Sequence, residues 1–378
     1  RSRLYFSFIG SGQATLSING ETVIEAEGTD LSQTTSKRLR LNKGDHDLKL
    51  TYKSPASGPS QIRLLWQGRD FPLEPVAPTY LTHTKSALAK TQDDLRQGRQ
   101  LVTSLNCTKC HSPGELSSAA MPELSRDTPT LQNAGNKYNE SWMAAWIQNP
   151  KNMRHSATMP KLLKHSSVEE ALQAGDTSAL DLAAYLATLK TEELDTQKSS
   201  PSLIKDGGDI FHKLGCISCH TRPDKENDKK RLSLSNISSK YSSVGALSDF
   251  LKNPAKHYKW IRMPDFKLNE KESLSLAAFL MDKSAQKTPA FTKGNATKGK
   301  DLYKSLGCIS CHDANQTPSS KPLSELKTGG CLDGKVADYS LSDQSSEAIS
   351  KFLQSAQKTL SKRQVAEFSS RQIKELNC

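Results

Sequence analysis

The sequence lacks any run of 18 apolar residues, so no segment is apolar for long enough to cross a membrane as a helix. Hydrophobic residues make up only 35% of the 378 residues, and the mean hydropathy is −0.61. A chain of this length normally forms two to four domains, and a low apolar fraction favours several small cores. Small cores need reinforcement by a disulfide, a metal or a large apolar cofactor.

Two further patterns are missing. No signal peptide is visible, and the chain starts with RSRLYFSFIG, which is typical of a strand inside a domain, so we expect an excerpt of a longer chain. The net charge is +12, but the lysines and arginines form no stripe interleaved with aromatic residues. Binding of nucleic acid is therefore not expected, and the basic residues are typical of solvated linkers and helix faces.

Residues 1–82 are patterned for an antiparallel β-sandwich. ATLSINGETVIEA alternates apolar and polar residues on both sides of Asn19-Gly20, which is a strong signal for a hairpin. KRLRLNKGDHDLKLTYK repeats this scheme around Lys43-Gly44, and QIRLLWQ supplies another strand. The order of these pieces resembles the second half of the β-sandwich of the anthrax protective-antigen type. Some members of that family bind carbohydrate through calcium, but the corresponding segment here, GSGQA, has no carboxylate.

A repeat begins after the proline-rich segment FPLEPVAPTYL. Three amphipathic segments, GRQLVTSLNC, GGDIFHKLGC and GKDLYKSLGC, each contain a glycine, at Gly98, Gly207 and Gly299. Each repeat ends with a second helical segment that carries an aromatic residue at a matching position, namely Tyr185, Phe279 or Phe352. We expect the glycine of the first helix to let it cross the closing helix of the same repeat at the aromatic residue.

Each amphipathic segment runs into C-x-x-C-H. The pairs are Cys107/Cys110, Cys216/Cys219 and Cys308/Cys311, followed by His111, His220 and His312. Two thiols at this spacing can add to the two vinyl groups of haem while the histidine reaches the iron, so the motif predicts three covalently attached haem c groups. Zinc sites need two such pairs per metal, and a thioredoxin-like pair needs a preceding strand instead of a helix.

Two repeats also offer a methionine as second axial ligand of the iron. KYNESWMAAWIQNPKNMRHSATMPKL and KYSSVGALSDFLKNPAKHYKWIRMPDFKL both end in Met-Pro, at Met159 and Met263. Met153 is the alternative to Met159, and Met121 is expected in a loop on the histidine side. With these segments, the first two repeats resemble class I cytochrome c domains. The resemblance implies an all-α domain around haem, one histidine and one methionine on each iron, and electron transfer.

The third repeat departs from this pattern. When the closing helices are aligned, Val336 occupies the position of Met263, and no methionine follows Met281. The third iron therefore lacks a methionine within its own repeat. Three possibilities stay open: an open coordination position, Cys331 as distal ligand, or a ligand from another repeat or from beyond the chain end. RQIKELNC resembles RQLVTSLNC, so Cys378 is interpreted as the first cysteine of a fourth motif, with its haem beyond the C-terminus.

These patterns predict a multidomain fold, a partial antiparallel β-sandwich followed by tandem all-α cytochrome c domains. The predicted parts are the sandwich (1–82), a first (83–192), a second (193–285) and a shortened third cytochrome c domain (286–360), and the start of a fourth (361–378). The predicted function is electron relay by an exported multihaem cytochrome, located in the periplasm or another extracytoplasmic compartment.

Two other functions remain as alternatives. One is a multihaem peroxidase or reductase that uses an open third haem for catalysis, and the other is a saccharide-associated surface module with accessory haems. Whether the chain is an enzyme is left open, with a non-catalytic electron carrier favoured. Expected partners are redox proteins or a dehydrogenase domain of the same longer chain, with saccharide contact through the sandwich as a further option.

Overall fold

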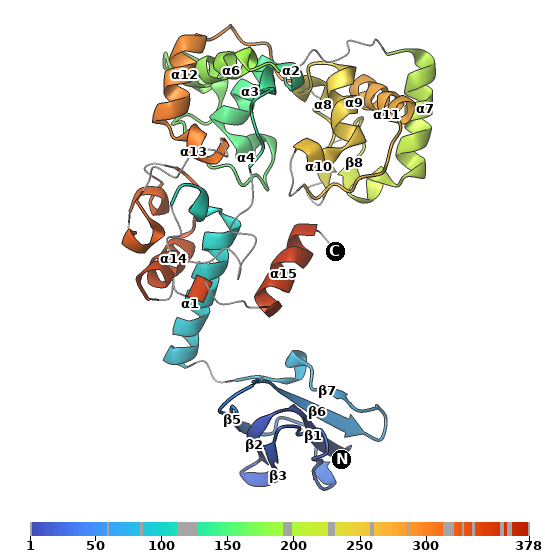
Figure 1. Cartoon of the computed structure of the whole chain (residues 1–378), viewed down its shortest axis with the longest axis vertical. Coiled ribbons are helices and arrows are strands. Elements are labelled where there is room, and N and C mark those ends of the chain that lie inside the picture. Colours follow the sequence, from blue (N-terminus) through green and yellow to red (C-terminus); the bar gives the residue numbers. More distant parts are fainter. Residues whose placement is uncertain are drawn as a thin grey trace. The chain divides into compact units, whose positions relative to one another are not determined.

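The computed structural model describes residues 2–58, 60–83, 86–111, 128–191, 199–225, 231–257, 261–285, 287–312, 321–326, 329–334, 337–355, 359–360 and 365–376. The chain divides into two compact units, Arg1–Ser86 and Ala87–Cys378. The first unit consists of antiparallel sheets and the second is mostly helical (Figure 1). Among the described helices, none combines the length and the apolar character that a membrane span requires.

The first unit contains two sheets around one hydrophobic cluster. The first sheet has the order β4 (Leu39–Leu41), β1 (Ser2–Gly10), β6 (Ile62–Gly68), β7 (Glu74–Pro75). The second has the order β3 (Glu21–Gly28), β2 (Gly12–Ile18), β5 (Leu48–Lys53). All strand pairs are antiparallel. Phe8 from the first sheet and Leu16 from the second are both fully buried in the shared cluster, as the alternating pattern predicts.

The two predicted turns have different outcomes. The hairpin at Asn19-Gly20 is confirmed, since β2 pairs with β3 and both turn residues have positive φ, 52° and 84°. The predicted hairpin around Lys43-Gly44 is wrong. β4 pairs with β1 and β5 pairs with β2, so the segment between them carries the chain from one sheet to the other.

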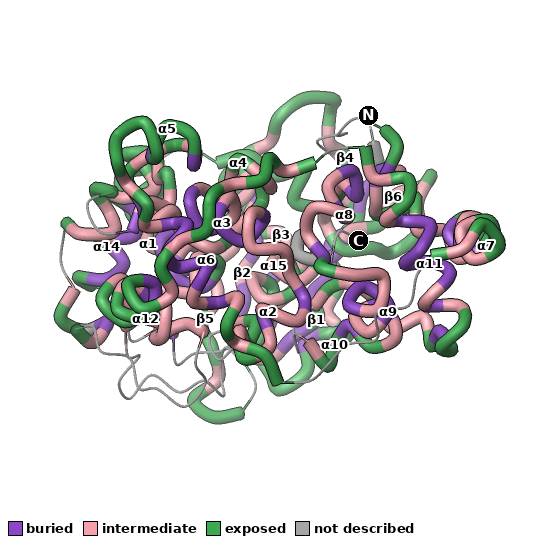
Figure 2. Tube along the Cα trace, turned by 90° about the horizontal axis from the view of Figure 1, so that it is seen from above, coloured by how far each residue is buried: buried purple, intermediate pink, exposed green. Residues whose placement is uncertain are grey.

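The second unit contains the predicted helices. Its elements are α1 (Ala87–Ser104), α2 (Ala134–Lys137), α3 (Glu140–Gln148), α4 (Pro150–Met153), α5 (Val168–Gln173), α6 (Ser178–Thr188), α7 (Pro201–Lys213), α8 (Ile237–Lys240), α9 (Val244–Lys252), α10 (Pro254–His257), α11 (Glu270–Lys283), α12 (Ala296–Ser305), α13 (Cys308–His312), α14 (Asp343–Ser355) and α15 (Val365–Leu376). Helices α1, α7 and α12 precede the three motifs, and α6, α11 and α14 are the closing helices. Figure 2 shows the buried stretches along α6 and α11.

The second repeat closes on itself, as predicted. Helix α7 packs along α11, and a Cβ added to Gly207 would overlap the carbonyl oxygen of Ser275 and approach Cβ of Phe279. The rings of Phe211 and Phe279 lie 5.6 Å apart, centroid to centroid. The glycine is therefore needed for the close approach of the two helix backbones.

The first and third repeats exchange their helices. Helix α1 packs along α14, and α12 packs along α6 (Figure 1). A Cβ on Gly98 would overlap the carbonyl oxygen of Ala348 and Cβ of Phe352, while one on Gly299 would overlap the carbonyl oxygen of Asp181 and Cβ of Tyr185. The predicted crossings of Gly98 with Tyr185 and of Gly299 with Phe352 are therefore wrong.

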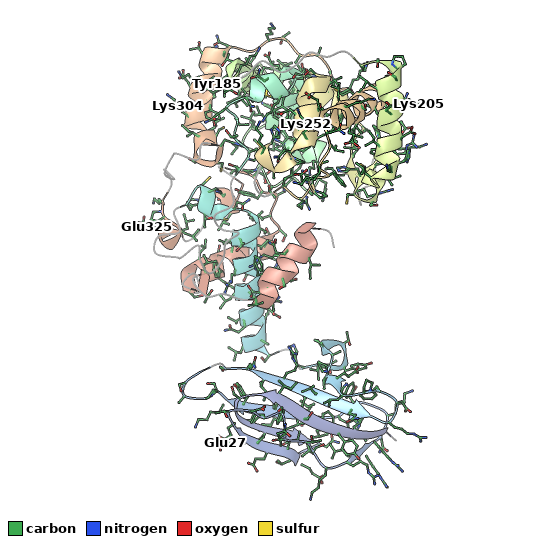
Figure 3. The ribbon with its side chains drawn as sticks, turned by 45° about the vertical axis from the view of Figure 1, so that its right-hand side comes forward. Glu27, Tyr185, Lys205, Lys252, Lys304 and Glu325 are labelled. Atoms are coloured by element: carbon green, nitrogen blue, oxygen red, sulfur yellow. The ribbon has the colours of Figure 1, made fainter. Side chains whose placement is uncertain are left out.

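Polar contacts fix both exchanged pairs. On one side, Lys351 Nζ lies 2.7 Å from Asp94 Oδ2. On the other, the backbone N–H of Asn295 donates to Asp181 Oδ1 at 2.6 Å, and this Asp181 side chain is buried. Figure 3 shows Tyr185 and Lys304 on the two neighbouring helices of the second pair. All three repeats have a glycine in the first helix and an aromatic residue in the closing helix. Contacts outside this shared pattern therefore decide which helices pair.

Repeats one and two meet at a short antiparallel bridge between Tyr138 and Tyr241. Ser242 N–H donates to the carbonyl of Lys137, and Asn139 N–H donates to that of Lys240. The ammonium group of Lys240 lies 5.2–5.6 Å from the ring centroids of Tyr138, Trp142 and Tyr241. Burial, together with the positive charge of Arg154, lowers the pKa of Lys240 from 10.5 to about 8.

We expect the stability of the folded chain to rise with pH through this lysine. Between pH 8 and 10.5 the unfolded chain holds a proton at Lys240 that the folded chain does not, so the free energy of unfolding increases across that window. The gain is at most about 3 kcal/mol, and it is reduced because the three rings favour the charged form. Lys240→Met should remove this slope in denaturant titrations from pH 7 to 10. Lys205→Met, at an exposed position on α7 (Figure 3), should keep it, and equal slopes in both variants would contradict the prediction.

Candidate functional site

The three C-x-x-C-H motifs begin in the same way. The residue before each first cysteine has a left-handed backbone, with φ of 55° at Asn106, 68° at Gly215 and 73° at Gly307. Glycine and asparagine are the residues that adopt this conformation most readily. A helical turn follows, as the 3₁₀ turns Cys107–Lys109 and Cys216–Ser218 or as α13. In such a turn, cysteines three positions apart lie on the same face.

Each motif histidine is oriented by a backbone carbonyl. Nδ1 of His111 lies 2.8 Å from the carbonyl oxygen of Lys321, Nδ1 of His220 lies 3.3 Å from that of Leu232, and Nδ1 of His312 lies 2.9 Å from that of Pro129. An Nδ1–H that donates to a carbonyl leaves Nε2 as the unprotonated nitrogen. No described residue bonds Nε2 of these histidines, so all three can bind iron through it.

One thiol of each motif packs on an apolar cluster, namely Cys107, Cys216 and Cys308. The seven described cysteines form no disulfide with one another, and all of them except Cys219 are at least partly buried. Burial, reinforced by nearby Cys331 and Cys110, raises the pKa of Cys107 to about 12, and burial raises that of Cys308 to about 11. Burial therefore disfavours the thiolate form of these two thiols.

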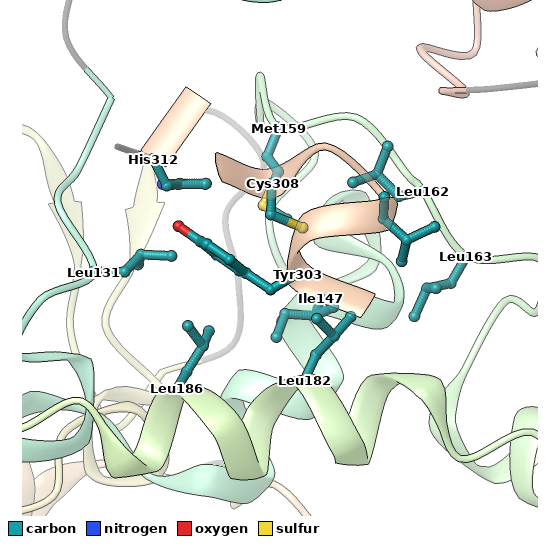
Figure 4. A pocket seen from close by; sticks show the side chains of 11 residues that line it. Leu131, Ile147, Met159, Leu162, Leu163, Leu182, Leu186, Tyr303, Cys308 and His312 are labelled. Carbon is teal, nitrogen blue, oxygen red and sulfur yellow. The ribbon is translucent and has the colours of Figure 1, made fainter. Parts of the chain in front are cut away.

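The third motif opens onto a hollow that contains a methionine of the first repeat (Figure 4). Cys308 and His312 line it together with Met159. The remaining walls are Leu131, Ile147, Leu162, Leu163, Leu182, Leu186, Tyr303 and Leu306. Nε1 of Trp146 donates to Sδ of Met159 at 3.2 Å, which holds the thioether in place. A histidine, a thiol and a thioether on one apolar hollow fit a covalently bound haem with two axial ligands.

The second motif is enclosed by its own repeat, except at its second cysteine. Cys216 and Met263 both pack on the hydrophobic cluster that contains Phe211 and Leu276. His220 is bonded to the carbonyl of Leu232, also from this repeat. Burial lowers the pKa of His220, and a nearby arginine adds to the effect, so the imidazole stays neutral as an iron ligand requires. These residues of the second repeat are compatible with a bound haem, and His220 and Met263 as its axial ligands stay a prediction.

Cys219 disagrees with the surroundings expected of a haem-attaching thiol. The sequence predicts that Cys216 and Cys219 bind one haem together, but Cys219 is exposed and only Cys216 packs on the apolar cluster. The physical reason is its place at the end of the 3₁₀ turn. Its N–H donates to the carbonyl of Cys216 and its carbonyl accepts from Leu232 N–H, which fixes the backbone outside the cluster. Of the two thiols of this motif only Cys216 is partly buried, and attachment of haem through Cys219 stays a prediction.

The first motif packs on the third repeat. Cys107 contacts a cluster that includes Leu323, Ile349 and Phe352, with Leu326 and Leu332 at its edge. Cys331 lies on the same side, close enough for its charge to raise the pKa of Cys107. Sγ of Cys110 lies 3.7 Å from Sγ of Cys311, so the first and third motifs adjoin.

One family model matches the chain. Residues 95–190 match the model described as Cytochrome c. This segment is similar to cytochrome c. The match supports a c-type cytochrome with covalently bound haem and haem-based electron transfer. No curated protein and no solved structure matches the chain.

The matched segment is continuous in sequence but divided in space. Its N-terminal helix α1 and the first motif pack on α14, whereas the remainder, through α6, packs on α12 and the third motif. The matched segment therefore contributes residues to the surroundings of two different C-x-x-C-H motifs.

The other predicted site residues have these positions. Met143 is buried in the core, as expected. Met153 packs on the cluster of the first repeat but does not line the hollow with His312. Met121, Val336 and Cys378 lie outside the described residues, and so do the predictions that concern them.

Some residues of the cytochrome c sites could not be found from the sequence. Pro129, Lys321 and Leu232 act through backbone carbonyls, which carry no signature in the side chain. Trp146 follows a helical pattern typical of core residues, and its bond to Met159 depends on how the chain returns to α3. Only the exchange of helices reveals that Met159 and His312 lie together.

Proposed function

We propose that the chain is an extracytoplasmic multihaem c-type cytochrome that relays electrons between three haems. The observation that carries the proposal is the shared arrangement of His111, His220 and His312. Each follows a C-x-x-C pair and donates from Nδ1 to a carbonyl, which directs Nε2 at the position of an iron. A bound haem supplies reversible one-electron exchange at its iron.

The protein itself contributes attachment, orientation and exclusion of water. The thiols anchor the group, the histidines are held by backbone carbonyls, and the apolar clusters keep the sites dry. The distance of 3.7 Å between Sγ of Cys110 and Sγ of Cys311 supports a relay, since two haems attached there would adjoin. The donor and acceptor would be redox proteins, or a dehydrogenase domain of a longer chain.

The first test is the number of haems. A pyridine haemochrome assay on the chain matured in a bacterial periplasm is expected to give three haems per polypeptide. Variants with one motif altered, Cys107→Ala/Cys110→Ala, Cys216→Ala/Cys219→Ala or Cys308→Ala/Cys311→Ala, should each give two. A chain with no haem and with bound zinc would end the proposal.

A further inference from the structure

Each of the two exchanged units combines the motif helix of one repeat with the closing helix of the other. Cys308 and His312 belong to the third repeat, as do Tyr303 and Leu306, and the other residues that line the hollow come from the first, including Met159, Leu182 and Leu186. Tyr303 of α12 is buried in the cluster of the first repeat, 5.5 Å from the ring of Tyr185.

The histidine of the third motif also depends on the first repeat. Nδ1 of His312 is bonded to the carbonyl of Pro129, in the segment that leads into α2. Both sides of the hollow are thus set by the first repeat. Pro129 orients the imidazole, and Trp146 holds Sδ of Met159.

The reciprocal half shows the same exchange. Nδ1 of His111 is bonded to the carbonyl of Lys321, which belongs to the third repeat. Val102 of α1 and Phe352 of α14 are both fully buried in one cluster, and Cys107, Leu326 and Leu332 pack against it. The two segments replace each other as in domain swapping, but within one chain.

We propose that Met159 is the distal ligand of the haem attached at Cys308 and Cys311, opposite His312, and not of the haem at Cys107 and Cys110. This inference rests on the proposed function. It selects a ligand from another repeat among the three possibilities for the third iron. It also changes which haem lacks a methionine ligand. That haem is then the one at the first motif, which packs on the segment of the third repeat that contains Cys331.

The test compares Met159→Leu in two backgrounds, each lacking one motif. A methionine bound to ferric haem gives a charge-transfer band in the far red, and its intensity is measured per haem. In the Cys107→Ala/Cys110→Ala background, Met159→Leu should lower the intensity of this band, because one of the two remaining haems loses its methionine ligand. In the Cys308→Ala/Cys311→Ala background, the same substitution should leave the band unchanged.

Every other outcome overturns the proposal. Loss of the band only in the background without the third motif would assign Met159 to the first haem. No loss in either background would exclude Met159 as a ligand, and loss in both would show a general structural effect. The haem count separates this failure from that of the proposed function. Two haems per background, whatever the band does, leave the multihaem proposal intact.

A second measurement needs no motif variant. A zero-length carbodiimide cross-linker on the full holoprotein should join Asp94 to Lys351, whose carboxylate and ammonium lie 2.7 Å apart across the exchanged helices. The pair Lys252 and Glu270 of the second repeat, at 4.0 Å, is the matched control. If the control pair is joined and Asp94–Lys351 is not, the exchange is absent and the assignment of Met159 is overturned.

Discussion

Met263→Ala is expected to convert one haem per chain from six-coordinate to five-coordinate. Met263 is half-buried on the same cluster as Cys216, so its thioether is placed for the iron that His220 would hold. Alanine cannot reach the metal, and the cluster supplies no second methionine at this position. The altered site should become high-spin and, when reduced, bind one equivalent of carbon monoxide.

The potential of the second haem should also fall. Methionine opposite histidine favours the reduced iron, so its loss lowers the potential. Axial ligands set haem potentials over a range of ~0.8 V, so the shift should be resolved in a potentiometric titration. Met281→Ala is the matched control, because Met281 packs on the same cluster from α11. Equal effects of both substitutions, or none, would refute Met263 as a ligand.

Phe352→Ala is expected to cause a large loss of stability in the helical unit. Phe352 is fully buried, and its Cβ faces Gly98 across the contact of α1 and α14. Removing a buried phenyl ring costs about 3–5 kcal/mol through lost burial and the cavity left behind. Because α1 leads into the first motif, the destabilisation should reach the haem at His111.

Hydrogen exchange locates this effect. In Phe352→Ala, amides of α1 and α14 should lose protection while those of α12 and α6 keep it. Phe279→Ala makes the same change in the second repeat and should loosen α7 and α11 only. Loss of protection in α12 instead of α1 would mean that each repeat closes on itself.

The sequence was sufficient to locate each motif and the helices around it. Spacing of the apolar residues placed α1, α7 and α12 before the motifs, and the glycines at Gly98, Gly207 and Gly299 all lie at close helix contacts. These features are local, and each depends on a few residues within one or two helical turns. The hairpin predicted at Asn19-Gly20 was correct for the same reason. The hairpin predicted at Lys43-Gly44 was wrong, because the strands on either side of it pair with distant strands.

The surroundings of each thiol could not be predicted from the sequence. Cys216 and Cys219 belong to the same motif, yet one packs on the apolar cluster of the second repeat and the other is exposed. Spacing fixes how far apart two cysteines lie along a turn, but the segments that cover the turn come from elsewhere in the chain. Burial of a thiol is therefore a property of the tertiary structure.

The partners of the repeated parts depended on tertiary structure as well. Two copies of LGCISCH specify the same turn, but they do not specify which distal segment covers it. Gly98 and Gly299 lie at equivalent positions, as do Tyr185 and Phe352, so the shared pattern does not distinguish the two pairings. Contacts that no repeat pattern contains, namely Asp94 with Lys351 and Asn295 with Asp181, distinguish between them. The sequence by itself thus determined three C-x-x-C-H motifs and the helices that lead into them, and only the packing of distant segments brought Met159 to His312.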